Sequence, residues 1–295
     1  MPRQFAGEVA SVLQTGAELG EGPVWDARDS LLLWVDLHKG RFHRYDPVSG
    51  QADWRDVGQA LGAVMPRERE GYVLAVHDGF ATLDAFRSPL RTVALVEADR
   101  PDNRMNDGAC DTRGRFWAGT MADDSAPHAG ALYRLSADGH VTEVLRGTSV
   151  SNGIGWNPED DRMYYIDSAE RRVDVFAWEP DAGHVSQRRV LIETTGMAGV
   201  PDGLAVDEEG CIWVAFFGGG CVRRFTSSGI LDLEVHLPVT QVTSCAFGGS
   251  GLDVLYITTA RRGLPAKSRV GQPHAGDVFA VDAGVRGVPC NLFAG

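Results

Sequence analysis

Four short segments place an acid or an amide just before a glycine, and these are the positions at which the sequence could do chemistry. They are Glu21 before Gly22, Asn106 and Asp107 before Gly108, Asn152 before Gly153, and Asp202 before Gly203. Carboxylate and amide oxygens are hard ligands, which suit Ca²⁺, Mg²⁺ or Mn²⁺. Asx-Gly pairs are also common turn residues, and we interpret Asp107 as a turn residue of that kind. Glutamate is a poor turn former, so turn chemistry leaves Glu21 unexplained.

These residues stand at regular distances before large aromatic side chains. Glu21 and Asn152 precede Trp34 and Tyr165 by one common spacing, and Asn106 and Asp202 precede Trp117 and Trp213 by another that is slightly shorter. The aromatic residues belong to short apolar runs that recur along the chain: LLLWVD (31–36), YVLAV (72–76), RFWAGT (115–120), MYYID (163–167), IWVAF (212–216) and VLYITT (254–259). One residue in each run serves as its anchor: Trp34, Leu74, Trp117, Tyr165, Trp213 and Tyr256. The steps between these anchors are 40, 43, 48, 48 and 43 residues, the length of one four-stranded propeller blade.

Six such units predict an all-β protein, a six-bladed β-propeller that occupies residues 1–295 as a single domain. The innermost strand of each blade lines the central channel of a propeller. Equivalent positions in different blades therefore meet near one axis, and the sequence predicts a metal-containing channel. A strand around Glu8–Gln14 is expected to complete the last blade, which removes exposed sheet edges. A β-sandwich, the main rival, does not explain the long period.

Composition narrows the partners and the compartment. The net charge is −12, which disfavours nucleic acid as a partner. The five cysteines include no CxxC pair, a pattern typical of unpaired thiols in a reducing compartment. The N-terminal residues lack the apolar core of a signal peptide, and every apolar run is too short to span a bilayer. We therefore expect a cytoplasmic protein without membrane contact, either a monomer or a weak oligomer.

Longer stretches around these positions resemble the senescence marker protein/gluconolactonase/regucalcin family. The stretches are LGEGPVW (19–25), NRMNDGACDTRGRFWAGTM (103–121), VSNGIGWNPEDDRMYYIDS (150–168) and PDGLAVDEEGCIWVA (201–215). The resemblance covers nearly the whole chain and implies a six-bladed propeller with one divalent cation in its channel. It implies that Glu21, Asn152 and Asp202 are the metal ligands. The cation could be Ca²⁺, Zn²⁺, Mg²⁺, Mn²⁺ or Fe²⁺.

The same resemblance implies a reaction, the hydrolysis of a sugar lactone such as gluconolactone, xylonolactone or arabinonolactone to its aldonic acid. Arg104 and Asn106 match substrate-contacting positions of the family. A further substrate contact is Glu in some members and is Asp124 here, one methylene shorter. Asp202 is the candidate general base, and a metal can polarise the lactone oxygen. Arg104 could instead belong to a structural ion pair.

Other functions stay open on the sequence alone. A calcium-binding regulatory protein of regucalcin type with little catalysis would share the ligands, and so would a related esterase or phosphotriesterase. A propeller scaffold for protein partners would not need Glu21. The sequence contains no GxSxG, GxGxxG or HExxH motif, which disfavours a serine hydrolase, a dinucleotide-binding protein and a zinc protease. We expect a hydrolase that acts on a small-molecule lactone.

Overall fold

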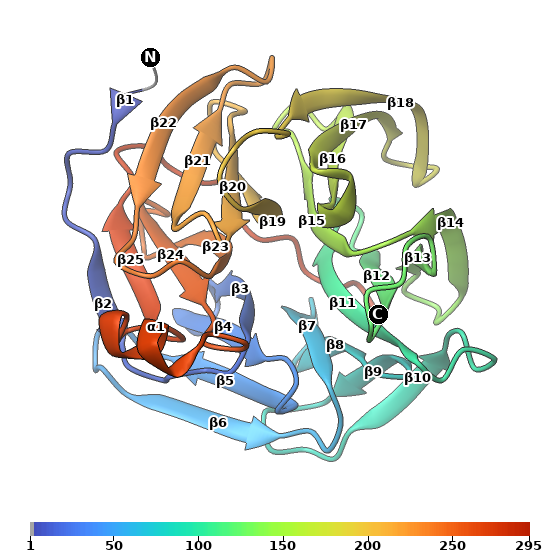
Figure 1. Ribbon diagram of the computed structural model, residues 1–295. Helices are drawn as coiled ribbons and strands as arrows, with labels where there is room; N and C mark the ends of the chain where they lie inside the picture. The colour runs from blue at the N-terminus through green and yellow to red at the C-terminus, as the bar shows by residue number, and fades with distance from the viewer. Residues whose placement is uncertain (1–2) are drawn as a thin grey trace.

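The structure is a computed structural model that describes residues 3–295, in which six sheets form a ring around a central channel (Figure 1). Within each sheet, successive segments of the chain pair antiparallel from the channel outward, and strands from the beginning of the chain add to two of the sheets. The innermost strand of each sheet contacts the innermost strand of the next. This arrangement is the predicted six-bladed β-propeller.

The first three sheets use the chain up to residue 148. Sheet one contains β3 (Gly20–Asp26), β4 (Leu31–Asp36), β5 (Arg41–Tyr45) and β6 (Ala52–Asp56). Sheet two contains β7 (Leu61–Pro66), β8 (Tyr72–Val76), β9 (Gly79–Leu83) and β10 (Arg91–Leu95). Sheet three contains β11 (Asn103–Cys110), β12 (Phe116–Ala122), β13 (Gly130–Leu135) and β14 (Val141–Thr148).

The other three sheets combine later residues with two strands from the beginning of the chain. Sheet four contains β15 (Ser151–Trp156), β16 (Arg162–Asp167), β17 (Arg172–Glu179) and β18 (His184–Glu193). Sheet five contains β19 (Val200–Val206), β20 (Ile212–Phe217), β21 (Cys221–Phe225), β22 (Leu231–His236) and β1 (Arg3–Gln4). Sheet six contains β23 (Val242–Gly248), β24 (Val254–Thr259), β25 (Val278–Asp282) and β2 (Ala10–Leu13).

The second strand of each sheet is almost entirely buried, with at most one half-buried residue. Trp34, Trp117, Tyr165 and Trp213 are fully buried there. Such strands read as continuous apolar runs in sequence. The outermost strand β6, by contrast, alternates between exposed and half-buried residues. The periodic signal of the sequence therefore comes from the second strands.

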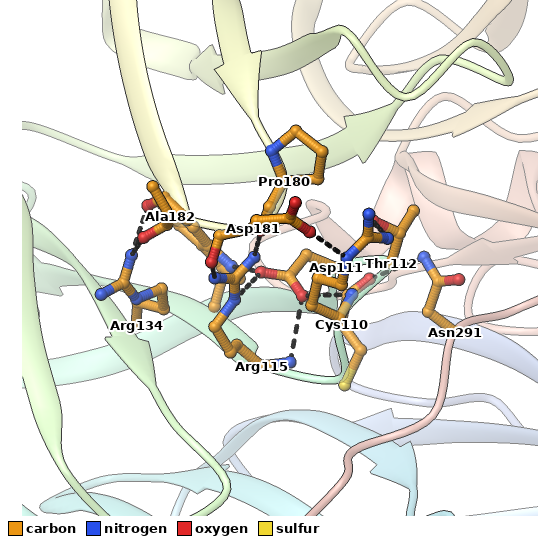
Figure 2. A network of polar contacts seen from close by, with 12 residues as sticks. Cys110, Asp111, Thr112, Arg115, Arg134, Pro180, Asp181, Ala182 and Asn291 are labelled. Atoms are coloured by element: carbon orange, nitrogen blue, oxygen red, sulfur yellow. Dashed lines mark hydrogen bonds and ion pairs between the residues drawn. The ribbon is translucent and has the colours of Figure 1, made fainter.

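Buried aspartates attach the aromatic residues of two second strands to the hairpins that precede them. Asp111 Oδ2 accepts hydrogen bonds from Trp117 Nε1 at 2.8 Å and from Arg115 Nε at 2.6 Å. Arg115 also donates to the carbonyl of Pro180 in the next sheet, and Figure 2 shows Arg115 together with Asp111 and Pro180. Asp207 repeats the arrangement by accepting from Trp213 Nε1 at 2.8 Å. The bond from Arg115 to Pro180 joins sheets three and four, whereas the contacts of Asp111 and Asp207 with the tryptophans lie within one sheet.

Both ends of the chain help to close the ring. Strand β2 pairs with β25 in sheet six, with Ser11 opposite Phe279, which confirms the expected closure by residues around Glu8–Gln14. Residues 287–295 then cross the end of the channel (Figure 1). Backbone N–H groups of Val288 and Phe293 donate to carbonyls at the ends of β19 and β7, at 3.4 and 2.9 Å.

Helices are few in the described part of the chain. They are the 3₁₀ turn η1 (Ser168–Glu170) and the short helix α1 (Ala266–Gly271). Between residues 3 and 295, neither the length nor the apolar character of any helix is sufficient to cross a bilayer.

Candidate functional site

A β-bulge lies at the same place in every innermost strand, and the predicted site residues lie at these bulges. The register with the second strand shifts between Glu21 and Val24, between Met105 and Gly108, between Asn152 and Ile154, and between Pro201 and Leu204. A bulge changes the direction of a side chain and increases the local twist. In the sequence, an acid or an amide followed by glycine therefore marks a β-bulge that is repeated from sheet to sheet.

Glycine at these bulges has two structural reasons. Gly22 has a φ of +51°, in the left-handed region that most side chains avoid. Gly203 is different, because a Cβ there would collide with the hydroxyl of Ser244 on the neighbouring strand β23. The glycines let the innermost strands approach closely while the preceding residue keeps its polar side chain.

A continuous hydrogen-bond chain joins three of the predicted residues. Arg104 Nη1 donates to Asn106 Oδ1 at 2.7 Å, and Asn106 Nδ2 donates to Asn152 Oδ1 at 2.9 Å. The amide of Asn152 donates in turn to Ser168 Oγ at 2.8 Å. All four side chains are buried at the beginning of the innermost strands or beside them. The structure thus brings together residues 104, 106 and 152.

Glu21 and Asp202 form a buried pair of carboxylates at the same end of the channel, with exposed fractions of 8% and 6%. Burial, together with the negative charge of Asp202, raises the pKa of Glu21 well above its ordinary range. Burial and the charge of Asp107 raise the pKa of Asp202 in the same way. The Oδ1 atom of Asp202 is buried without a hydrogen-bond partner. Two such carboxylates need a nearby positive charge to be ionised together.

This donor set fits a hard divalent cation. Two carboxylates and the amide oxygen of Asn152 supply only oxygen ligands, as Ca²⁺ and Mg²⁺ prefer. Within residues 3–295, no group of three His, Cys, Asp or Glu side chains is arranged to hold a metal. The candidate site therefore depends on Asn152 as its third donor.

This chain is similar to known proteins over nearly its whole length. The family described as SMP-30/Gluconolactonase/LRE-like region matches residues 19–261. The chain belongs to this family. Regucalcin from Danio rerio is 37% identical over 292 residues, which cover 98% of this chain and 99% of that protein.

Two solved structures are also similar over nearly their whole length. A calcium-binding protein, regucalcin, from Agrobacterium tumefaciens is 29% identical, with a TM-score of 0.93 over 98% of both chains. The luciferin-regenerating enzyme is 32% identical, with a TM-score of 0.92 over 98% of this chain and 100% of that one. These likenesses establish the propeller fold of the SMP-30/gluconolactonase family for this chain.

The position at which some members of the SMP-30/gluconolactonase family carry Glu does not join the site in this structure. Asp124 is exposed, and its Oδ1 accepts a hydrogen bond from Ala126 N at 2.9 Å. Its neighbour Asp123 lies 3.2 Å from Arg104 Nε instead. Asp124 thus bonds to the backbone of Ala126 in the same loop, and the carboxylate of Asp123 faces Arg104.

Two further residues, His38 and Arg262, lie near Arg104 at the channel mouth. Burial and the positive charges of Arg104 and Arg262 lower the pKa of His38 to about 4, so His38 is neutral at neutral pH. Arg262 follows β24 and lies 3.8 Å from Glu18. No motif marks either residue, because their proximity to Arg104 arises only when separate sheets are assembled.

Below the carboxylates the channel continues as a cavity of about 440 Å³. Its walls are the later residues of the innermost strands, and Val288–Asn291 of the C-terminal segment line the opposite end. Asp107 borders this cavity, within the bulge of β11. Our interpretation of Asp107 as a turn residue is wrong, because it lies in a strand and faces the channel. Burial raises its pKa to about 6.

Proposed function

We propose that this protein hydrolyses the ester bond of a sugar lactone, such as gluconolactone, xylonolactone or arabinonolactone, to the open aldonic acid. The observation that supports this most is the chain Arg104–Asn106–Asn152 beside the buried carboxylates Glu21 and Asp202. A simple ion-binding protein does not need a buried arginine next to its ligands. Membership of the SMP-30/gluconolactonase family supports the same reaction class.

In this proposal Glu21, Asn152 and Asp202 hold one divalent cation, which supplies Lewis-acid polarisation of the lactone carbonyl. Asp202 accepts a proton from the attacking water, since its Oδ1 is a buried acceptor without a partner. The water oxygen forms the new bond to the carbonyl carbon, the ring C–O bond breaks, and Asp202 returns the proton to the leaving oxygen. Arg104 and Asn106 orient the sugar hydroxyls.

The proposed partners follow from the same features. The substrate is a small polar molecule, and the net charge of −12 disfavours nucleic acid and anionic membrane surfaces as partners. The five cysteines are free, which fits a reducing compartment, and we place the protein in the cytoplasm. Monomers or weak oligomers are sufficient, because every proposed site residue belongs to one chain.

Acid release from freshly prepared pentonolactones and hexonolactones tests the proposal. Each lactone is mixed with protein that has been treated with chelator, and then with Ca²⁺, Mg²⁺, Mn²⁺, Zn²⁺ or Fe²⁺. Glu21→Gln is expected to abolish the metal-dependent rate, whereas Glu18→Gln, a matched change at the rim, retains it. The proposal is refuted if no lactone opens faster than it does spontaneously with any of the metals.

A calcium-binding regulatory protein is the second candidate, because solved and curated relatives carry the name regucalcin. Titration calorimetry separates the two functions. Tight, selective Ca²⁺ binding without turnover of any lactone would favour the regulatory protein. Aryl esters and phosphotriesters belong in the same panel, since a related esterase would use the same residues.

A further inference from the structure

The residue that precedes each proposed ligand has its carbonyl tied by a polar side chain. The three hydrogen bonds are Thr243 Oγ1 to Gly20 O at 2.6 Å, Asn106 Nδ2 to Ser151 O at 2.8 Å, and Ser168 Oγ to Pro201 O at 2.6 Å. Each donor comes from the sheet that precedes the ligand's own sheet around the ring. The ligands are therefore positioned by contacts between blades, in addition to the bulges within them.

Ser168 differs from the other two donors because it contacts two ligand segments at once. Its hydroxyl donates to Pro201 O, next to Asp202, and accepts from Asn152 Nδ2 at 2.8 Å. The side chain is 6% exposed and lies at the start of η1, directly after β16. Movement of Ser168 would disturb both Asn152 and Asp202.

The chemistry of Ser168 also fixes which way the Asn152 amide points. A carbonyl can only accept, so the single hydroxyl proton of Ser168 goes to Pro201 O. The Ser168 oxygen is then left as an acceptor, and only the NH₂ group of Asn152 can donate to it. The carbonyl oxygen of Asn152 must face the channel, where a cation requires an oxygen. A flipped amide would present hydrogens to the cation.

The residues just before Glu21 and just before Asn152 are each held by the carboxylate of an aspartate. Among residues 3–295, those just before Asp202 have no such contact with a carboxylate. Asp36 accepts from the backbone N–H groups of Glu18 and Leu19, both at 3.0 Å, just before Glu21. Asp167 accepts in the same way from residues 149 and 150, at 2.8 and 2.9 Å, just before Asn152. Asp36 and Asp167 follow their ligands at the same distance along the chain, and the residue at that distance after Asp202 is Phe217. Phe217 has no carboxylate that could accept these backbone hydrogen bonds. The bond from Ser168 to Pro201 O is a side-chain contact that holds this segment instead.

We propose that Ser168 is a positioning residue for the cation site, which holds the Asn152 oxygen toward the cation and fixes the strand that carries Asp202. The inference rests on the proposed function only in that it requires the cation site. It assigns no catalytic step to Ser168.

The test is cation binding by Ser168→Ala, with Ca²⁺ measured by calorimetry and Eu³⁺ by its luminescence lifetimes in H₂O and D₂O. Loss of a residue that orients a ligand typically lowers metal affinity by about 10- to 100-fold, and we expect that range here. The lifetimes should show about one more bound water, because water replaces the displaced Asn152 oxygen. Thr194→Ala is the matched control, since Thr194 is buried and donates to Arg171 O after the same 3₁₀ turn.

Several outcomes would overturn the inference. If the wild type binds Ca²⁺ and Ser168→Ala matches it in affinity and in bound water, this inference fails while the cation site stands. If the wild type binds no divalent ion, the proposed function fails and the inference with it. In Asn152→Ala, a further Ser168→Ala change should cost less than it does alone, and full additivity contradicts the route through Asn152. Should Ser168→Ala not fold, Ser168→Cys keeps the size with a weaker hydrogen bond and should show a smaller loss.

Discussion

Replacing Asp107 by asparagine should stabilise the cation-free protein at neutral and alkaline pH. Asp107 borders the cavity in the bulge of β11, and its Oδ1 accepts a hydrogen bond from Gly108 N at 2.8 Å. Asparagine retains that acceptor and nearly the same shape. It removes only the charge, which also contributes to the raised pKa of both Glu21 and Asp202.

The size of the effect follows from the pKa of Asp107, which burial raises from 3.8 to about 6. One pKa unit corresponds to about 1.4 kcal/mol, so keeping Asp107 ionised in the folded state costs about 3 kcal/mol. Water in the cavity screens part of that charge, which makes this figure an upper bound. For a chain of this length, about 3 kcal/mol corresponds to about 5 °C in Tm.

The sign of the pH dependence is the reverse of the usual aspartate case. Between pH 4 and pH 6 the folded state holds a proton on Asp107 that the unfolded state has lost, so wild-type stability falls as pH rises. Asp107→Asn lacks this dependence. The two proteins should have nearly equal stability at pH 4 and should differ by up to about 3 kcal/mol at pH 8.

Urea unfolding at pH 4 and pH 8, with chelator present, measures the difference. Asp138→Asn is a matched control in the turn between β13 and β14 of the same sheet, because Asp138 is exposed and accepts from His140 N at 3.0 Å. The control should change stability by less than about 0.5 kcal/mol at either pH. The reasoning is wrong if Asp107→Asn is no more stable than wild type at pH 8, or if its advantage is the same at both pH values.

Three further predictions concern the cation site and the fold. Glu21→Gln removes one of two carboxylate ligands and should weaken Ca²⁺ binding by at least about 100-fold in calorimetry; an unchanged affinity excludes Glu21 as a ligand. Lowering the pH should weaken Ca²⁺ binding to the wild type, because the pKa values of Glu21 and Asp202 are raised and the cation needs both carboxylates ionised. Ca²⁺ binding should therefore release protons, and proton uptake on binding would contradict this. Asp111→Ala should cost about 3–5 kcal/mol in urea unfolding, since it leaves Arg115 Nε and Trp117 Nε1 without their acceptor in a buried position. A loss below about 1 kcal/mol would show the network to be dispensable.

The fold could be predicted because the residues that fill the space between neighbouring sheets recur at regular distances along the sequence. Large apolar side chains such as Trp34 and Trp213 fill the space between sheets, and one such side chain occurs in the second strand of each blade. The placement of the proposed ligands in the channel could be predicted for a related reason. The bulge that directs Glu21, Asn152 and Asp202 inward lies at a nearly fixed distance from those large residues.

Other features could not be predicted because they depend on contacts between blades or on local hydrogen bonds. Ser168 looks like any serine after a strand, and its role appears only when Pro201 lies beside it. Asp123 and Asp124 are adjacent and identical in type, and a bond to Ala126 N decides which of them is turned away from Arg104. The helix α1 lacks the apolar periodicity of a packed helix, since none of its residues is buried.

Pairing of β2 with β25 has a consequence for synthesis on the ribosome. The sixth sheet needs residues 10–13 and residues 278–282 together, so a growing chain remains an open ring until residues 278–282 have been translated. Sheets one to five can form in order as their residues emerge. The innermost strand β3 lacks its neighbour β23 for most of that time, and this neighbour carries Thr243, which holds the carbonyl before Glu21. The proposed cation site is therefore completed only after the sixth blade has been translated, when the first and sixth blades meet.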